Sequence, residues 1–93
     1  MQNKDLTVII PALNEERTLR ACLDSVKRLN PLEIIVVDGG SADRTARIAE
    51  EARAVIIQSP KGRGIQMNKG ASLARGEILL FLHSDTCIPE MKN

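Results

Sequence analysis

Four short apolar runs, separated by longer polar stretches, constrain the fold of this 93-residue chain more than any other feature of its sequence. The runs span residues 6–10, 33–37, 54–57 and 77–82. Each has the length of one strand and lacks polar alternation, which is typical of strands covered on both faces in a parallel sheet. The intervening stretches of 22, 16 and 19 residues all exceed the roughly ten residues that a parallel crossover requires. We therefore expect a parallel sheet of about four strands.

The stretches between the runs carry helical patterns. Residues 15–29 repeat apolar side chains at three- and four-residue steps, and Asn14 is the expected N-cap of this helix. Residues 42–53 form a second expected helix with Ser41 as its cap, and a third helix follows a glycine-rich loop near residues 65–74. Right-handed crossovers place helices on both faces of the sheet. The expected fold class is therefore α/β, a Rossmann-like parallel sheet.

The composition disfavours several kinds of partner and site. Thirteen basic against twelve acidic residues leave a net charge of +1, and there is one phenylalanine without any Trp or Tyr, which disfavours binding to nucleic acid. The longest apolar run is far shorter than the roughly 20 residues of a membrane span, and the first residues have no signal-peptide pattern. Cys22 and Cys87 lack the spacing of a zinc site or a disulfide framework. We expect one cytoplasmic domain over residues 1–93, without a transmembrane segment or a nucleic-acid partner.

Polar residues follow each of the four runs, at the edge where open parallel sheets bind their ligands. They occupy residues 11–16, 38–41, 59–64 and 83–86. Asp38 follows four apolar residues and precedes two glycines, so we expect its carboxylate at a strand end where the backbone can approach a ligand closely. Asp38 then either accepts a hydrogen bond from a base or ribose, or caps the turn into the second helix.

Asp85 closes the most apolar run and belongs to a polar cluster that begins at His83. A single carboxylate can hold Mg²⁺ or Mn²⁺ together with a diphosphate, because hard cations take oxygen ligands and share them with substrate phosphates. His83 is either an ordinary polar surface residue or a metal or phosphate contact. In the glycine-rich loop, Lys61 and Arg63 either neutralise phosphate charge or extend into solvent.

Familiar cofactor motifs are absent from the sequence. The turn after the first run has Glu15 and Glu16 where a dinucleotide fold needs glycines and free helix amides, which disfavours NAD. There is neither a Walker A loop nor a nucleophile elbow. What remains is recognition of a nucleotide by acids at the strand ends, aided by a divalent ion.

Four sequence blocks, in order, resemble the first half of a family 2 glycosyltransferase with the GT-A fold. The blocks span residues 8–16, 35–45, 67–71 and 74–86. The resemblance implies a partial GT-A fold that binds a nucleotide-sugar donor, usually a UDP-sugar. The residues expected to bind that donor are Pro11, Ala12, Glu15, Asp38, Gly39, Arg63 and Asp85. The resemblance implies that Pro11, Ala12 and Glu15 line the nucleotide pocket and that Asp38 forms a hydrogen bond with the base.

The resemblance also implies where the metal binds. Asp85 corresponds to the final acid of the family's DxD motif, which holds the Mg²⁺ or Mn²⁺ that bridges the diphosphate. His83 stands in place of the first acid of that motif, and Met67 stands where many members have arginine. Arg63 is expected to supply the positive charge that Met67 lacks.

The family's reaction is metal-assisted transfer of the sugar with inversion, and a carboxylate base deprotonates the acceptor. In the family that base comes from a later segment, so the catalytic residue is unknown here, and we expect a truncated donor-binding half that is inactive alone. The alternative is a non-catalytic nucleotide-binding module that keeps Asp38. The family's strand order leaves the strand from Glu77 to Leu82 unpaired on one side, so we also expect a homodimer through this apolar edge.

Overall fold

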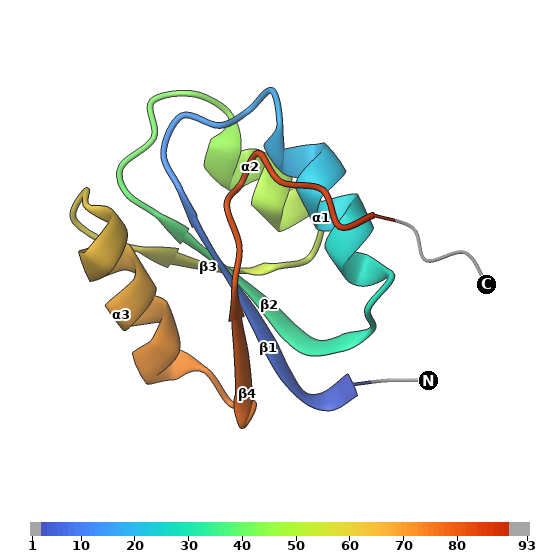
Figure 1. Ribbon diagram of the computed structural model, residues 1–93. Helices are drawn as coiled ribbons and strands as arrows, with labels where there is room; N and C mark the ends of the chain where they lie inside the picture. The colour runs from blue at the N-terminus through green and yellow to red at the C-terminus, as the bar shows by residue number, and fades with distance from the viewer. Residues whose placement is uncertain (1–2, 90–93) are drawn as a thin grey trace.

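A computed structural model describes residues 3–89, and in that range strands and helices alternate along the chain (Figure 1). The strands are β1 (Asn3–Ala12), β2 (Pro31–Asp38), β3 (Val55–Gln58) and β4 (Ile78–Phe81). The helices are α1 (Leu19–Lys27), α2 (Thr45–Glu51) and α3 (Arg63–Leu73). The predicted order of strands and helices is confirmed. Across the described range, none of the helices has the length and apolar character to cross a membrane.

The strands form one parallel sheet with the order β3-β2-β1-β4, so the predicted Rossmann-like α/β class is confirmed. β1 lies in the interior of the sheet, with β2 on one side and β4 on the other. The register between β1 and β2 runs as far as the pair of Ala12 with Asp38. Because the strands are parallel, the polar segments that follow them leave the sheet at the same edge.

Helices cover both faces of the sheet, as expected, but they do so unequally (Figure 1). α1 and α2 pack on one face, where Val8 and Ile10 of β1 are fully buried in the larger core cluster. α3 alone packs on the other face, over a smaller cluster that includes Ile9 and Val37. This division follows from strand geometry, because successive side chains of a strand point to opposite faces.

α1 begins at Leu19 rather than at residue 15, so the predicted N-cap Asn14 is wrong. Asn14 has a φ of 53°, which is left-handed rather than helical, and asparagine tolerates this conformation better than most residues. Its side-chain carbonyl accepts a hydrogen bond from the backbone N–H of Ala42 at 2.8 Å. The side chain that was expected to cap α1 therefore holds the loop after β2.

α2 begins at Thr45, so the predicted cap Ser41 is also wrong. The Ser41 hydroxyl donates to the carboxylate of Asp38 instead. Asp43 lies closer to the helix start, and its carboxylate accepts the backbone N–H of Thr45 at 2.9 Å. Hydrogen bonding from Thr45 lowers the pKa of Asp43, which keeps this acid charged next to the first turn.

α3 begins at Arg63, two residues before the predicted start, so Arg63 lies in the helix and its predicted place in the glycine-rich loop is wrong. Gly62 precedes the helix with a φ of 144°, a conformation that side chains rarely adopt. Its backbone N–H donates to the side chain of Gln66 at 3.1 Å. A bond from within the helix thus fixes the first turn and with it the Arg63 backbone.

β4 is an edge strand, as the resemblance implied, with β1 on one side only. Ile78 is 60% exposed and Phe81 is 40% exposed, although both side chains are large and apolar. The predicted homodimer through this edge stays a prediction.

Candidate functional site

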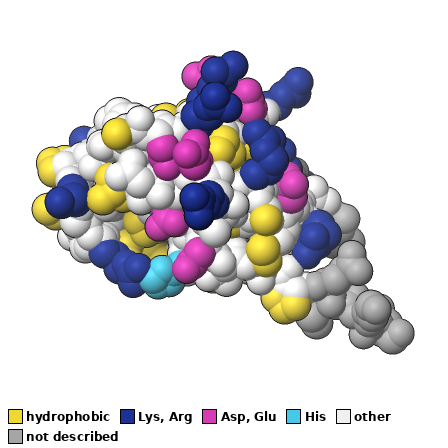
Figure 2. Space-filling model, turned by 90° about the horizontal axis from the view of Figure 1, so that it is seen from above, with side chains coloured by type: hydrophobic (Ala, Val, Ile, Leu, Met, Phe, Trp, Pro, Cys, Tyr) yellow, Lys and Arg dark blue, Asp and Glu magenta, His cyan; other side chains and the backbone are white. Residues whose placement is uncertain are grey.

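Charged side chains gather at the carboxyl edge of the sheet, where acidic and basic groups are interleaved (Figure 2). Asp38 ends β2 at this edge and is only 3% exposed. Its carboxylate accepts hydrogen bonds from the backbone N–H of Ser41 at 3.1 Å and from the Ser41 hydroxyl. This arrangement caps the turn, which was one of the two alternatives for Asp38. Binding of a base by the same carboxylate stays a prediction.

Hydrogen bonds across the carboxyl edge join the loop after β1 to the loop after β2. The backbone N–H groups of Asn14 and Glu15 donate to Ser41 Oγ and Thr45 Oγ1, each at 2.8 Å. Thr45 is fully buried although it is polar. The bond from Glu15 to Thr45 was not predicted from the sequence. The pattern that indicated it was a threonine on the apolar face of a helix, where a hydroxyl needs a partner. The result is a fixed position for Glu15 beside the sheet.

Gln66 of α3 was also missed, and it connects three segments at the same edge. Its Nε2 donates to the carbonyl oxygens of Ala12 at 3.0 Å and Val37 at 2.9 Å, while its Oε1 accepts the N–H of Gly62. The side chain is buried, and all of its hydrogen-bonding atoms have partners. A Cβ on Gly39 would lie 3.0 Å from the Gln66 amide group, so the small residue at position 39 makes room for this connection.

One pocket at this edge, of about 210 Å³, brings four of the predicted donor-binding residues together. We call it the β1-loop pocket. It is lined by Pro11, Ala12, Leu13, Glu15, Lys61, Gly62, Arg63 and Gln66. Asp38 and Gly39 do not line this pocket. A Cβ on Gly39 would lie 3.0 Å from the amide group of Gln66, and Gln66 does line the pocket. The predicted grouping of Pro11, Ala12, Glu15 and Arg63 is therefore present, and Asp38 is the register partner of Ala12 in the neighbouring strand.

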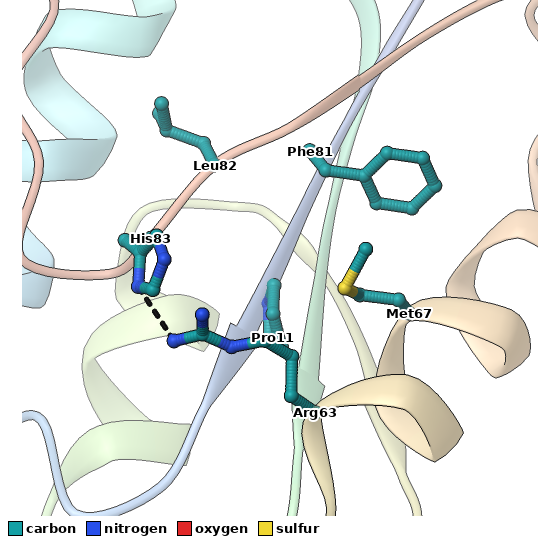
Figure 3. A pocket seen from close by; sticks show the side chains of 6 residues that line it. All are labelled: Pro11, Arg63, Met67, Phe81, Leu82 and His83. Carbon is teal, nitrogen blue, oxygen red and sulfur yellow. Dashed lines mark hydrogen bonds between the residues drawn. The ribbon is translucent and has the colours of Figure 1, made fainter.

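A second pocket, of about 180 Å³, adjoins the first and shares Pro11 and Arg63 with it. We call it the β4 pocket. It is lined by Pro11, Arg63, Met67, Phe81, Leu82 and His83 (Figure 3). Arg63 extends from the start of α3 toward the segment after β4, and its Nη2 lies 2.8 Å from His83 Nδ1. Arg63 is therefore the residue that links the two pockets.

Asp85 lies outside both pockets, exposed in a turn that is closed by a bond from Thr86 N–H to the His83 carbonyl at 3.0 Å. The segment after β4 crosses toward α1 (Figure 1), where Ile88 N–H donates to Ser25 Oγ at 2.9 Å. Burial, together with the charges of Cys87 and Asp85, raises the pKa of the buried Cys22 thiol to about 11. The Cys22 thiol therefore stays protonated near neutral pH.

The fit of a divalent metal to these residues depends on what else is bound. Within residues 3–89, no group of three or more His, Cys, Asp and Glu side chains is arranged to hold a metal ion. Asp85 offers one exposed carboxylate, and hard cations take six or more oxygen ligands, of which phosphates and water can supply the rest. The donor set thus fits Mg²⁺ or Mn²⁺ when a diphosphate is bound with it.

The sequence matches the family model described as Glycosyl transferase family 2 over residues 7–92. A PGL/p-HBAD biosynthesis glycosyltransferase of Mycobacterium bovis is 40% identical over 90% of this chain and 36% of its own length. The human dolichyl-phosphate beta-glucosyltransferase is 29% identical over 88% of this chain and 31% of its own length. The chain spans about a third of the length of these curated relatives.

Solved structures show the same relationship. Glucosyl-3-phosphoglycerate synthase from Mycobacterium tuberculosis in complex with uridine diphosphate has a TM-score of 0.81 and 30% identity over 90% of this chain and 35% of that chain. The same enzyme in complex with Mg²⁺ and uridine diphosphate has a TM-score of 0.79 and 30% identity over 88% of this chain and 34% of that chain. The family model matches nearly all residues, and the strand order and the polar carboxyl edge agree with that match. The chain belongs to the family 2 glycosyltransferases.

Proposed function

We propose that this chain binds the nucleotide-sugar donor, a UDP-sugar, for a metal-assisted glycosyl transfer with inversion. The single observation that carries the proposal is the β1-loop pocket, because it gathers Pro11, Ala12, Glu15 and Arg63 at the carboxyl edge of a parallel sheet. The similar synthase whose complexes contain uridine diphosphate supports the choice of uridine as the nucleoside. We treat residues 1–93 as one donor-binding unit.

In this proposal Asp38 recognises the base. A carboxylate has about four acceptor positions, and the bonds from Ser41 leave some of them available. The proposed partner is the N–H of the uracil ring, and Gly39 contributes to this site by making room for the Gln66 amide group beside the end of β2. The bond from Gln66 to Val37 holds the end of β2 in place for this contact.

The diphosphate is proposed to lie near Arg63, where the β1-loop pocket and the β4 pocket meet, with Lys61 as a second positive charge. Asp85 is proposed to hold Mg²⁺ or Mn²⁺ jointly with the phosphate oxygens, as the complexes of the similar synthase with either metal suggest. When bound, the metal would stabilise the negative charge on the departing diphosphate. We assign no residue of this chain as the general base that deprotonates the acceptor, and expect no transfer by these 93 residues alone.

Calorimetric titration with UDP, with and without Mn²⁺, tests the proposal. UDP is expected to bind the parent chain more tightly with Mn²⁺ than without it, and Asp85→Ala is expected to abolish the difference. Asp38→Asn is expected to weaken UDP and uridine alike, because its amide would present an N–H donor toward the uracil N–H. Absence of UDP binding under all conditions would refute the proposal.

Within residues 3–89 Asp85 belongs to no group of three or more possible metal ligands, and this favours one alternative, a non-catalytic module that binds a nucleotide and transfers nothing. The same titration separates the two functions. If UDP binds equally well with and without Mn²⁺, and Asp85→Ala changes neither affinity, the module is the better description.

We also propose that a second copy of the chain pairs with the open edge of β4. The unpaired main chain and the exposed side chains of Ile78 and Phe81 support this proposal, because an apolar edge strand is a template for another strand. Sedimentation equilibrium should detect a dimer that Ile78→Lys dissociates, and a monomer at every concentration would contradict it. The cytoplasm is the proposed compartment, which both free cysteines support.

A further inference from the structure

The contact between Arg63 and His83 determines what the imidazole can do. Arg63 Nη2 lies 2.8 Å from His83 Nδ1 (Figure 3), and a guanidinium group can only donate hydrogen bonds. In this contact Nδ1 must therefore accept, and the tautomer that allows it carries its proton on Nε2. The lone pair of one ring nitrogen is occupied by Arg63, and the other nitrogen is a donor.

The position of this proton determines whether His83 can bind a metal ion. An imidazole ligates a metal ion through a nitrogen lone pair, and in this arrangement neither ring nitrogen has one available. His83 stands where the family motif has an acid. An acid attracts a cation, whereas His83 in contact with Arg63 offers an N–H group, which attracts negative charge. Asp85 is then the one side chain of the segment 83–86 that offers a negatively charged oxygen to a hard cation.

The charge of Arg63 is also available for an anion. Among residues 3–89, the ion pairs to carboxylates involve Arg20, Arg47 and Arg75, and Arg63 forms none. Arg63 and His83 are both exposed, and both line the β4 pocket, while Arg63 lines the β1-loop pocket as well. A guanidinium with unused N–H groups beside a ring N–H is a set of donors that matches phosphate oxygens.

We propose that Arg63 and His83 form a two-donor site for the diphosphate of the nucleotide sugar, in which His83 orients Arg63 and does not ligate the metal. This inference rests on the proposed function, because it assigns the nucleoside to the neighbouring β1-loop pocket. It adds a specific consequence: part of the affinity for UDP is independent of any divalent ion.

The experiment is a set of calorimetric titrations in the presence of EDTA, with uridine, UDP and inorganic diphosphate as probes. Removal of a charge-assisted hydrogen bond should weaken binding roughly tenfold. Arg63→Ala and His83→Ala should each weaken UDP and diphosphate by about this factor and leave uridine unchanged. Lys69→Ala is the matched control, because it removes one positive charge from an exposed position of the same helix outside both pockets, and it should change little.

Two further variants separate orientation from charge. His83→Asn keeps an acceptor near the position of Nδ1, so it should recover part of the UDP affinity that His83→Ala loses. His83→Asp should bind UDP at least tenfold more weakly than the parent in EDTA, because the acid neutralises Arg63 and repels phosphate, and Mn²⁺ should restore more affinity than it does in His83→Ala.

A nitrogen-15 spectrum of the imidazole gives an independent measurement, and its assignment is unambiguous because the chain has one histidine. The spectrum should show the tautomer protonated at Nε2, and diphosphate should shift it at roughly tenfold lower concentration in the parent than in Arg63→Ala. The Nδ1–H tautomer, or UDP affinities in EDTA that are the same in the parent, Arg63→Ala and His83→Ala, would overturn the inference. If uridine binds and diphosphate does not, the inference fails while the proposed function stands. If neither uridine nor UDP binds, the proposed function fails, and the diphosphate titration alone decides the inference.

Discussion

The two faces of the sheet are built differently. The face under α1 and α2 contains the larger core cluster, and its β1 side chains Val8 and Ile10 are fully buried. The face under α3 has a smaller buried cluster, and the large apolar side chains of β4 at its margin are partly exposed. We infer that the first face supplies most of the stability, while the second face and the adjoining carboxyl edge carry the binding residues.

The hollow between α1 and α2 differs from the two pockets beside α3 in its size and in the ion pairs of its arginines. The hollow between α1 and α2 is the larger, at about 530 Å³, and is lined by Glu16, Arg17, Arg20, Arg44, Arg47, Ile48 and Glu51. Two of its arginines, Arg20 and Arg47, pair with Glu51 at 2.6 and 3.5 Å. Arg63 in the smaller pockets has no such partner among residues 3–89. Arg17 and Arg44 of the larger hollow form no ion pair within residues 3–89 either, so the proposal that the smaller pockets bind the ligand rests on the residues they gather rather than on unpaired charge.

The largest effect is expected for a pair of isoleucines on the same face, Ile10 in the interior of the sheet and Ile78 at its open edge, in register with Leu6. Ile10→Ala, on the α1 face, should lower the free energy of unfolding by about 2–5 kcal/mol, because it removes a fully buried side chain and leaves a cavity. Ile78→Ala, on the exposed edge, should change it by less than about 0.5 kcal/mol. Urea denaturation of both variants measures the difference. Equal losses would mean that β4 is covered in solution.

Gln66→Met should lower the free energy of unfolding by about 1–3 kcal/mol, because the carbonyl groups of Ala12 and Val37 and the N–H of Gly62 would lose a buried partner. Since these groups border the β1-loop pocket, UDP should also bind more weakly. Denaturation and calorimetry on the same sample test the two expectations. Full stability would show that water replaces the three bonds.

Two glycines of α3 give a matched test of how closely this helix packs on the sheet. A Cβ at Gly70 would lie 2.5 Å from Ile9 Cγ2, so Gly70→Ala should destabilise the fold by about 1–3 kcal/mol. A Cβ at Gly64 would meet nothing within 4 Å, so Gly64→Ala should stabilise it by up to about 1 kcal/mol. Thermal denaturation distinguishes them, and the same sign for both would contradict the packing of α3.

The smallest expected effect concerns pH. Burial opposes the change, but hydrogen bonds from Arg75 and Thr7 lower the pKa of Glu33 below its ordinary value of about 4.5. A carboxyl group whose folded-state pKa is lowered stabilises the fold above its unfolded pKa. That stabilisation should therefore be complete at neutral pH and disappear as the pH falls below about 4.5 through the lowered value. Glu33→Gln should reduce the acid dependence of the melting temperature; an unchanged dependence would rule out this contribution.

Sequence reasoning succeeded where the physical cause is local along the chain. The apolar runs predicted all four strands, because burial on both faces leaves a continuous pattern in the sequence. It failed at helix starts, because Asn14 and Ser41 bond to residues across the carboxyl edge rather than to their own helices. The role of Gln66 was also not predicted, because two of its partners, Val37 and Ala12, lie 29 and 54 residues away in the sequence.

We propose that the carboxyl edge between the β1 loop and α3 binds the nucleotide. The change in backbone amide chemical shifts when UDP and Mg²⁺ are added to nitrogen-15-labelled protein tests this directly. The largest changes are expected at residues 11–15, 38–41 and 61–66. Changes centred instead on residues 16–20 and 44–51, around the larger hollow between α1 and α2, would contradict it.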